Sequence, residues 1–173
     1  MPNVLNCGKT SHSWCVTQEV LVAEIQINAP RQQIFEYLSV PTQFEKLNVN
    51  WYAMIVDVIN HESSDPNVLK FTLVEDIPIT LFTKRVESEI EMVLVKYESM
   101  YEKVTNDTGI YVEVFLDFIE NRKDANTTTI KHKITIDGGY LLRKISASIT
   151  KGVQVKWLED CKLLFEKTLK AVN

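Results

Sequence analysis

Residues 140–172, YLLRKISASITKGVQVKWLEDCKLLFEKTLKAV, predict one long amphipathic helix at the end of the chain. Its apolar residues recur mostly three or four positions apart, which is the spacing of a single helix face. Mainly strand-like segments precede it, so this helix must cover most of one face of a sheet. A curved sheet that grips such a helix usually leaves a hollow between the two. The apolar positions are Leu142, Ile145, Ile149, Val153, Trp157, Cys161, Leu164 and Phe165.

The segments before this helix predict an α+β fold with a curved antiparallel sheet of about seven strands. Thr17–Asn28 alternates and is rich in Val and Ile, which indicates the first strand. Pro30 begins a short helix that ends at Pro41, and a second short helix follows with Thr42 and Glu45 as a capping box. The remaining segments alternate with a period of two and are separated by turns rich in Asn, Asp and Ser.

One predicted strand has a clear two-sided pattern. Such alternation is typical of an antiparallel sheet with one buried and one solvated face. We therefore interpret its glutamates, and the neighbouring carboxylates Glu75 and Asp76, as solvated surface rather than as paired catalytic groups. The pattern consists of Val86, Ser88, Ile90, Met92 and Leu94 on one face, with Glu87, Glu89 and Glu91 on the other.

Length and composition predict one globular domain. The chain has 173 residues, of which 45% are apolar and 24% are charged, so it can bury a substantial core. A formal net charge of −4 argues against nucleic acid as the main partner, because phosphate binding needs a basic surface. Residues 1–16 are polar and aperiodic, and we expect them to form a flexible leader before a domain at 17–173.

The three cysteines do not suggest a disulfide framework in a chain of this length. No secretory signal is apparent at the N-terminus, and the apolar runs are too short to span a bilayer. These features predict a cytoplasmic location. Cys7, His12 and Cys15 offer three metal ligands without a fourth at zinc-like spacing, so we expect neither a metal nor a cofactor.

Segments near both ends of the chain carry a family resemblance. They are EIQINAP at 24–30, IFEYL at 34–38 and PTQFE at 41–45, together with Leu158–Lys167 near the end. They resemble the opening and closing motifs of the START-like superfamily, also called SRPBCC or the birch-pollen-allergen helix-grip fold. The likeness covers about residues 18–172. It is nearest to the polyketide-cyclase-like and coenzyme-Q-binding-like branches.

The resemblance implies a cavity between the sheet and the long helix that holds a hydrophobic small molecule. Members of the superfamily include lipid-transfer proteins, hormone receptors and ligand carriers, with a minority of cyclases and hydroxylase subunits. They share no universal catalytic residue, so none is carried over to this chain. Val40 stands where an Asp is usual before the second helix, which leaves the choice of branch open.

The candidate ligand-binding residues lie on the face that we assign to the inside of the sheet and on the long helix. His132 alternates with isoleucines and is either a polar anchor in the cavity or a core histidine. Ser88 and Tyr101 could each hydrogen-bond a ligand. A register error of one residue would reverse these assignments. The apolar candidates are Trp51, Met54, Met92, Phe118, Ile134, Leu142, Ile145, Ile149 and Val153.

Three hypotheses of function follow. We favour a binding or transfer protein for a lipid, an isoprenoid or a polyketide. The alternative is a polyketide cyclase or aromatase in which His132 or Tyr101 moves protons. In the third, side chains fill the groove and the surface serves a protein partner. The sequence leaves the oligomeric state open, and it shows no phosphate-binding loop or nucleophile elbow.

The long helix is also basic. Residues 140–172 contain seven Lys or Arg and three acidic residues. The first half carries Arg143, Lys144, Lys151 and Lys156 opposite an apolar face, a pattern suited to weak docking on anionic membranes. The alternative interpretation is a solvated helix face.

Overall fold

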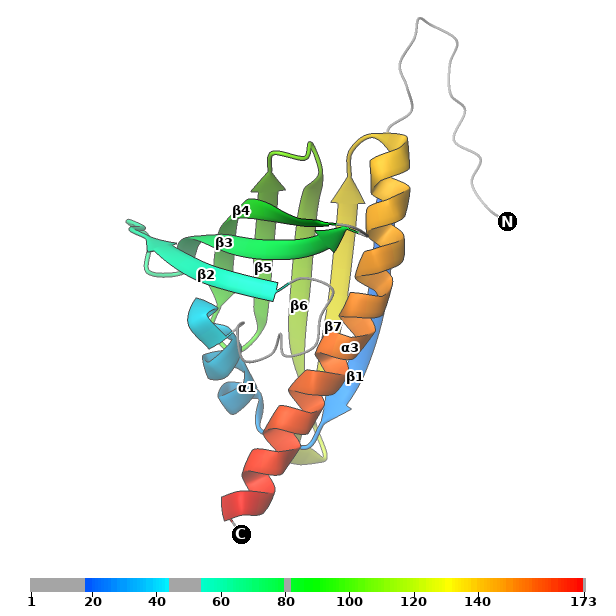
Figure 1. Ribbon diagram of the computed structural model, residues 1–173. Coiled ribbons are helices and arrows are strands. Elements are labelled where there is room, and N and C mark those ends of the chain that lie inside the picture. Colours follow the sequence, from blue (N-terminus) through cyan, green and yellow to red (C-terminus); the bar gives the residue numbers. More distant parts are fainter. Residues whose placement is uncertain (1–17, 44–53, 80–81, 173) are drawn as a thin grey trace, which may run out of the picture.

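The computed structural model describes residues 18–43, 54–79 and 82–172 of the chain. Figure 1 shows the elements in chain order. They are β1 (Glu19–Ile27), α1 (Arg31–Leu38), the 3-10 turn η1 (Pro41–Gln43), β2 (Met54–His61), β3 (Val68–Ile79), β4 (Phe82–Val95), β5 (Ser99–Asn106), β6 (Tyr111–Asn121), β7 (Asp124–Asp137) and α3 (Tyr140–Val172).

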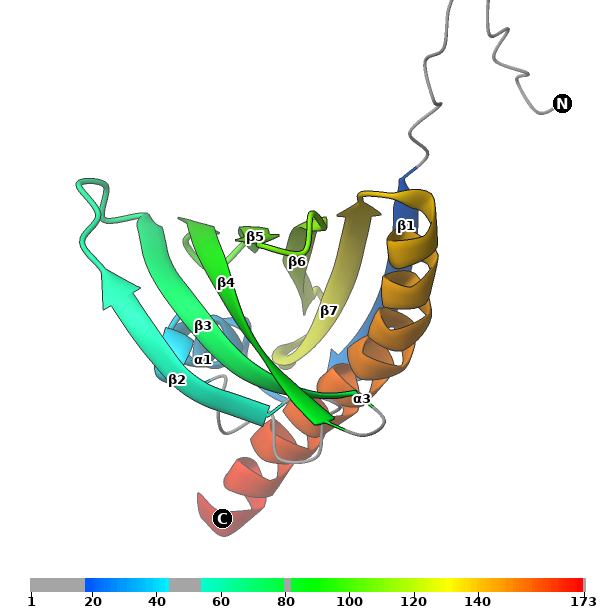
Figure 2. The same cartoon turned by 45° about the horizontal axis from the view of Figure 1, so that its top comes forward.

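The strands of the described part form one antiparallel sheet in the order β1-β7-β6-β5-β4-β3-β2. The sheet is strongly curved, and α1 and α3 lie on its inner side (Figures 1 and 2). α3 packs mainly against β1 and β7, and α1 packs against β6 and β7. Strands β2, β3 and β4 curve away on the side opposite α3 (Figure 2). This arrangement confirms the predicted helix-grip fold, including a seven-stranded sheet among the described residues.

The first helix forms directly after Pro30, as predicted, and ends at Leu38, three residues before the predicted end at Pro41. Pro30 is extended and directly precedes α1, while the backbone N–H of Ser39 donates to Phe35 O at 2.9 Å and closes the last turn. The predicted second helix begins at Pro41, and its described part is the single turn η1. Glu45 of the predicted capping box lies outside the described residues.

The two-sided pattern predicted for β4 is confirmed. Val86, Ser88, Ile90 and Met92 are buried on the inner face, whereas the glutamates between them point outward. Glu91 forms an ion pair with Lys70 of β3 at 3.3 Å, with both side chains partly exposed. The inner face of β4 therefore continues into the core, and its outer face is solvated.

The main core joins the inner face to α1 and to the second half of α3. Ile34 and Phe35 of α1 and Trp157 and Phe165 of α3 belong to one buried cluster. Phe35 packs edge-on against Phe118 of β6, with ring centroids 5.7 Å apart. Fully burying side chains of this size contributes about 1.5–3 kcal/mol each, so this cluster anchors the end of the grip where α1 lies.

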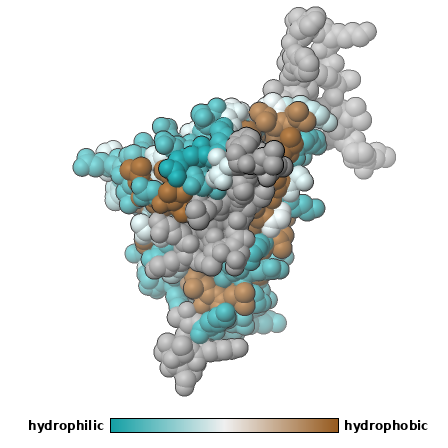
Figure 3. All heavy atoms as spheres, viewed as in Figure 1, coloured by the Kyte–Doolittle hydropathy of each residue, from teal (hydrophilic) through white to brown (hydrophobic). Residues whose placement is uncertain are grey.

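The first half of α3 departs from the predicted packing. We expected Leu142, Ile145 and Ile149 to pack on the sheet, but they are 48%, 50% and 39% exposed. Arg143 and Ala147 occupy the buried positions instead. The two sets lie on different sides of the helix, because each residue advances roughly 100° around its axis. Hydrophobic side chains consequently gather on the surface around the first turns of α3 (Figure 3).

Ionic contacts fix this half of α3 at the edge of the sheet. Lys144 Nζ lies 2.7 Å from Glu19 Oε1 of β1, and this contact lowers the pKa of Glu19. Arg143 donates from Nη1 to Gly138 O at 3.2 Å, and its Nε lies 3.8 Å from Glu19 Oε1. These contacts define the side of α3 that faces β1.

Candidate ligand-binding site

The pairing of the strands arranges the side chains of the inner face in rows that run across the sheet, and the candidate site lies in these rows. One row runs from Met92 on β4 through Glu102 on β5 and Val114 on β6 to Ile134 on β7. His132 lies two residues from Ile134 on the same face, in the neighbouring row. Strands are about 4.8 Å apart, so Glu102 and His132 are separated by roughly 10–12 Å.

Five of the predicted ligand-binding residues lie buried on this face. Burial is expected both of a cavity wall and of an ordinary core, so their contact with a ligand stays a prediction. Trp51 lies outside the described residues. Met54 is the first residue of β2, and its side chain also lies outside the described part of the chain. The five buried residues are Ser88, Met92, Phe118, His132 and Ile134.

Tyr101 lies on the outer face, so its predicted position inside the cavity is wrong. Its hydroxyl donates to Glu113 Oε1 at 2.6 Å, and its ring lies 4.4 Å from that of Phe115 between centroids. Partial burial and this hydrogen bond raise the pKa of Tyr101. Strand β5 carries apolar and polar residues on both faces, so its hydrophobic pattern leaves the register ambiguous.

Glu102 is the inner-face residue that sequence reasoning missed. It lies between Met92 and Val114 across the sheet, with Met100 and Val104 on either side of it along β5. Its side chain keeps part of its surface accessible, yet it has no hydrogen-bond or ion-pair partner within the described ranges. Removal from water raises the pKa of Glu102 to about 7. The sequence signal that could have placed Glu102 on this face is its position midway between the apolar residues Met100 and Val104, two residues from each.

His132 is the second polar group near the centre of the inner face. It is 7% exposed, and its ring lies 5.1 Å from that of Trp157 on α3 between centroids. Its Nδ1 is buried with no hydrogen-bond partner in the described part of the chain. Burial lowers the pKa of His132 to about 4, so the imidazole is neutral at pH 7. Gln154 donates from Nε2 to His132 O at 2.8 Å and ties α3 to β7.

Glu75 also faces inward, which corrects its interpretation as solvated surface. It pairs with the buried Val86 of β4, and burial raises the pKa of Glu75. The adjacent Asp76 points to the opposite face and accepts two hydrogen bonds from Arg85, at 2.9 and 3.0 Å. The hydrogen bonds from Arg85 lower the pKa of Asp76. The two neighbouring carboxylates therefore lie in opposite environments.

Basic side chains are found only at the margins of the described inner face. Lys84 stands at an inward position near the start of β4 but is exposed. Lys156 of α3 pairs with Asp160 at 3.2 Å, and Arg143 lies at the β1 edge. Away from these margins, the titratable groups that the described inner face presents are the carboxyls of Glu75 and Glu102 and the neutral imidazole of His132.

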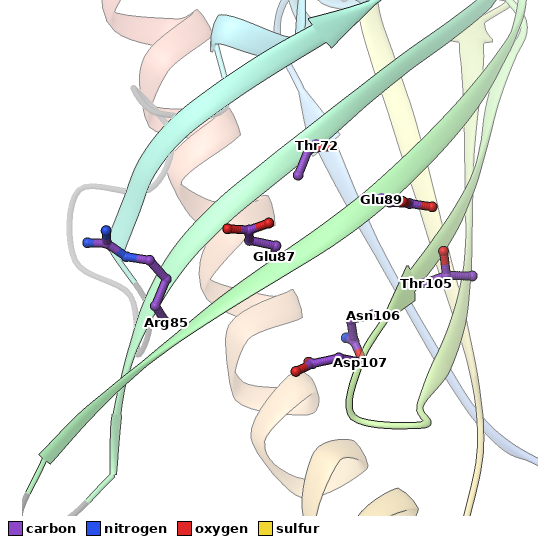
Figure 4. A pocket seen from close by; sticks show the side chains of 7 residues that line it. All are labelled: Thr72, Arg85, Glu87, Glu89, Thr105, Asn106 and Asp107. Carbon is purple, nitrogen blue, oxygen red and sulfur yellow. The ribbon is translucent and has the colours of Figure 1, made fainter.

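The outer face has open, polar grooves. The larger has a volume of about 730 Å³ and lies across β3, β4 and the end of β5 (Figure 4). A second groove of about 480 Å³ shares two of its lining residues, Glu89 and Thr105. Both are lined largely by charged and hydroxyl side chains, so they offer no apolar enclosure. The larger groove is lined by Thr72, Arg85, Glu87, Glu89, Thr105, Asn106 and Asp107.

Solved structures resemble this chain, whereas no protein-family profile and no curated protein matches it. The aromatase/cyclase Zhui from Streptomyces sp. R1128 superposes with a TM-score of 0.74 and 9% identity, over 91% of this chain and 99% of that one. Norcoclaurine synthase from Thalictrum flavum, solved with dopamine and hydroxybenzaldehyde, superposes with a TM-score of 0.64 and 15% identity. The match covers 95% of this chain and 98% of that one. The di-domain ARO/CYC BexL from the BE-7585A biosynthetic pathway superposes with a TM-score of 0.68 and 13% identity, over 86% of this chain.

These likenesses show that the chain has the helix-grip fold, which the resemblance of its sequence motifs implied. The chain spans about half the length of the di-domain BexL, since it covers 50% of that protein. None of the helices in the described ranges is long and apolar enough to cross a membrane.

Proposed function

We propose that the chain binds an apolar small molecule between the inner face of the sheet and α3, where Glu102 and His132 orient it. The observation that carries this proposal is Glu102, a partly accessible carboxyl without a partner among the described residues, set in an apolar row. An unpartnered polar group in such surroundings costs free energy, and such groups concentrate at functional sites, where a ligand can supply the partner.

The walls of the proposed cavity come from the sheet and from the exposed apolar row of α3. Ser88, Met92, Phe118 and Ile134 supply the sheet side, and Trp51 remains a candidate, whereas Met54 pairs with the outward-facing Asp76. Leu142, Ile145, Ile149 and Val153 follow one side of the helix, turned away from Lys144 and the β1 edge. We propose that this side of α3 lines the mouth of the cavity.

A cyclase or aromatase activity is the second candidate, and Glu102 is the observation that favours it. A carboxyl with a pKa of about 7 can both accept and donate protons at neutral pH. Glu102 takes the proton-transfer role that the sequence suggested for Tyr101, and His132 keeps its own. In a carrier, Glu102→Gln retains binding of an apolar ligand. In an enzyme, the same substitution abolishes turnover of an identified substrate and leaves its binding intact.

Weak contact of α3 with anionic membranes is a further proposal, and apolar residues contribute most of it. Lys144 and Lys156 pair with carboxylates of the same chain, and Arg143 is buried. Lys151 remains exposed, but it lies seven residues after Lys144 and therefore on the side of α3 away from the apolar row of Leu142, Ile145 and Ile149. Basic residues that already have carboxylate partners gain less from a lipid surface than free ones do.

Fluorescence of N-phenyl-1-naphthylamine, a neutral apolar probe, tests the proposed cavity. The wild-type protein is expected to bind the probe and enhance its emission. Val114→Phe, beside Glu102 on the inner face, is expected to reduce binding at least about tenfold by filling the cavity. Ile119→Phe, on the exposed outer face of the same strand, is the matched control and should bind as the wild type does. Equal binding by both variants would contradict the proposal.

A further inference from the structure

The charges on the inner face carry information about the ligand. Glu102 and Glu75 both point inward from β5 and β3, and neither has a basic partner within the described ranges. Other inner-face neighbours of Glu102, such as Met92 and Val114, are apolar. A carboxyl in this position gains most from a ligand that brings a positive charge.

The basic groups of the described residues are placed where they do not neutralise these carboxyls. Lys84 is exposed at an end of the sheet, Lys156 pairs with Asp160, and Arg143 lies at the β1 edge near Glu19. His132 is held neutral by burial, and its Nδ1 lacks a partner among the described residues. The carboxyls of the described inner face therefore disfavour an anionic ligand, and no described basic group near Glu102 compensates for them.

We propose that the cavity selects apolar compounds that carry a basic nitrogen, and that Glu102 forms the ion pair with that nitrogen. This inference rests on the proposed ligand-binding function and specifies its ligand class. The apolar rows of β4, β6 and β7 bury the hydrocarbon body, and the ammonium group lies against Glu102. His132, roughly 10–12 Å away across the sheet, is placed to hydrogen-bond a polar group at the far end of the ligand.

Three compounds with the same naphthalene body test this selection at pH 7.5: 2-naphthylmethylamine, 2-naphthylmethanol and 2-naphthoic acid. Each is titrated against the protein by calorimetry. The amine is expected to bind at least about tenfold more tightly than the alcohol, since a charge-assisted hydrogen bond exceeds a neutral one. The acid is expected to bind at least about tenfold more weakly than the alcohol. Equal binding of the amine and the alcohol, or tighter binding of the acid, overturns the inference.

Glu102→Gln assigns the selection to one residue. The substitution keeps the shape of the side chain and removes its charge, so affinity for the amine should fall to that of the alcohol. Glu89→Gln, on the exposed outer face of β4, is the control and should keep the wild-type ratio. Circular dichroism verifies the fold of each variant. An unchanged ratio of amine to alcohol in Glu102→Gln overturns the role of Glu102.

The outcomes separate this inference from the proposed function. If the alcohol and N-phenyl-1-naphthylamine bind but the amine has no advantage, the cavity exists and the charge selection is wrong. If none of these probes binds the wild-type protein, the proposed function itself fails. Both results are available from the wild-type protein alone, so neither depends on the folding of a variant.

Discussion

Glu102 destabilises the folded protein as pH rises and His132 destabilises it as pH falls, although burial is the cause in both cases. Burial in apolar surroundings disfavours the charged form of each side chain. It raises the pKa of Glu102 from 4.5 to about 7 and lowers the pKa of His132 from 6.5 to about 4. Glu102 therefore reduces stability increasingly as pH rises from 4.5 to 7, and His132 does so as pH falls from 6.5 to 4. A ligand that pairs with either group removes part of this cost.

Replacing Glu102 by Gln is expected to stabilise the empty protein relative to the wild type as pH rises. Between pH 4.5 and 7 the folded wild type binds more protons than the unfolded chain, so its stability falls with pH, whereas the variant lacks this slope. At pH 8 the relative gain should reach at most about 3 kcal/mol. Urea denaturation at pH 5 and pH 8 measures it. Glu89→Gln is the control, and a relative gain that does not grow with pH would contradict the expectation.

At the scale of elements, the success of a prediction depended on how cleanly polarity separates the two faces. Along residues 86–92 of β4 every second residue, from Val86 to Met92, is buried and the residues between them are glutamates, so the register followed from the pattern. β5 has Tyr101 on one face and Glu102 on the other, so the pattern favoured the wrong one. In α3 the row of residues that faces the sheet contains the buried Arg143. A pattern that assigns only apolar residues to the buried side does not predict an arginine there. The bounds of α3 were predictable because the extent of a helix follows from the three-to-four-residue spacing of its apolar residues, whichever side of the helix faces the sheet.

Exposed apolar residues on α3 give an element-scale prediction about membranes. Replacing Leu142 and Ile145 together by Ser should reduce co-sedimentation with phosphatidylserine vesicles several-fold, because the proposed contact places these two exposed side chains in the lipid interface. Lys151→Glu should have a smaller effect. Co-sedimentation at low and high salt measures both variants. A larger loss with Lys151→Glu, or no binding of the wild type at low salt, would refute contact through the apolar row.

At the scale of the whole molecule, the described contacts of α3 gather on one side of the curved sheet. α3 packs mainly on β1 and β7, and the main core joins α1 to the second half of the helix. Strands β2, β3 and β4 curve away from the first half of α3 (Figure 2). A ligand on the inner face would touch both sides, since Glu102 belongs to β5 and the apolar row belongs to α3. Binding should therefore couple regions that share few contacts in the empty protein.

Hydrogen exchange measured by mass spectrometry tests this coupling. Saturating N-phenyl-1-naphthylamine should slow amide exchange in β2–β4 and in the first turns of α3 together, because a ligand that binds only the native state suppresses its local opening. The α1 end of the core is already closed and should change little. Val114→Phe, with its cavity filled, should show no added protection, whereas Ile119→Phe should behave as the wild type does. Protection confined to α3 would place the probe on the exposed helix surface and contradict a cavity between helix and sheet.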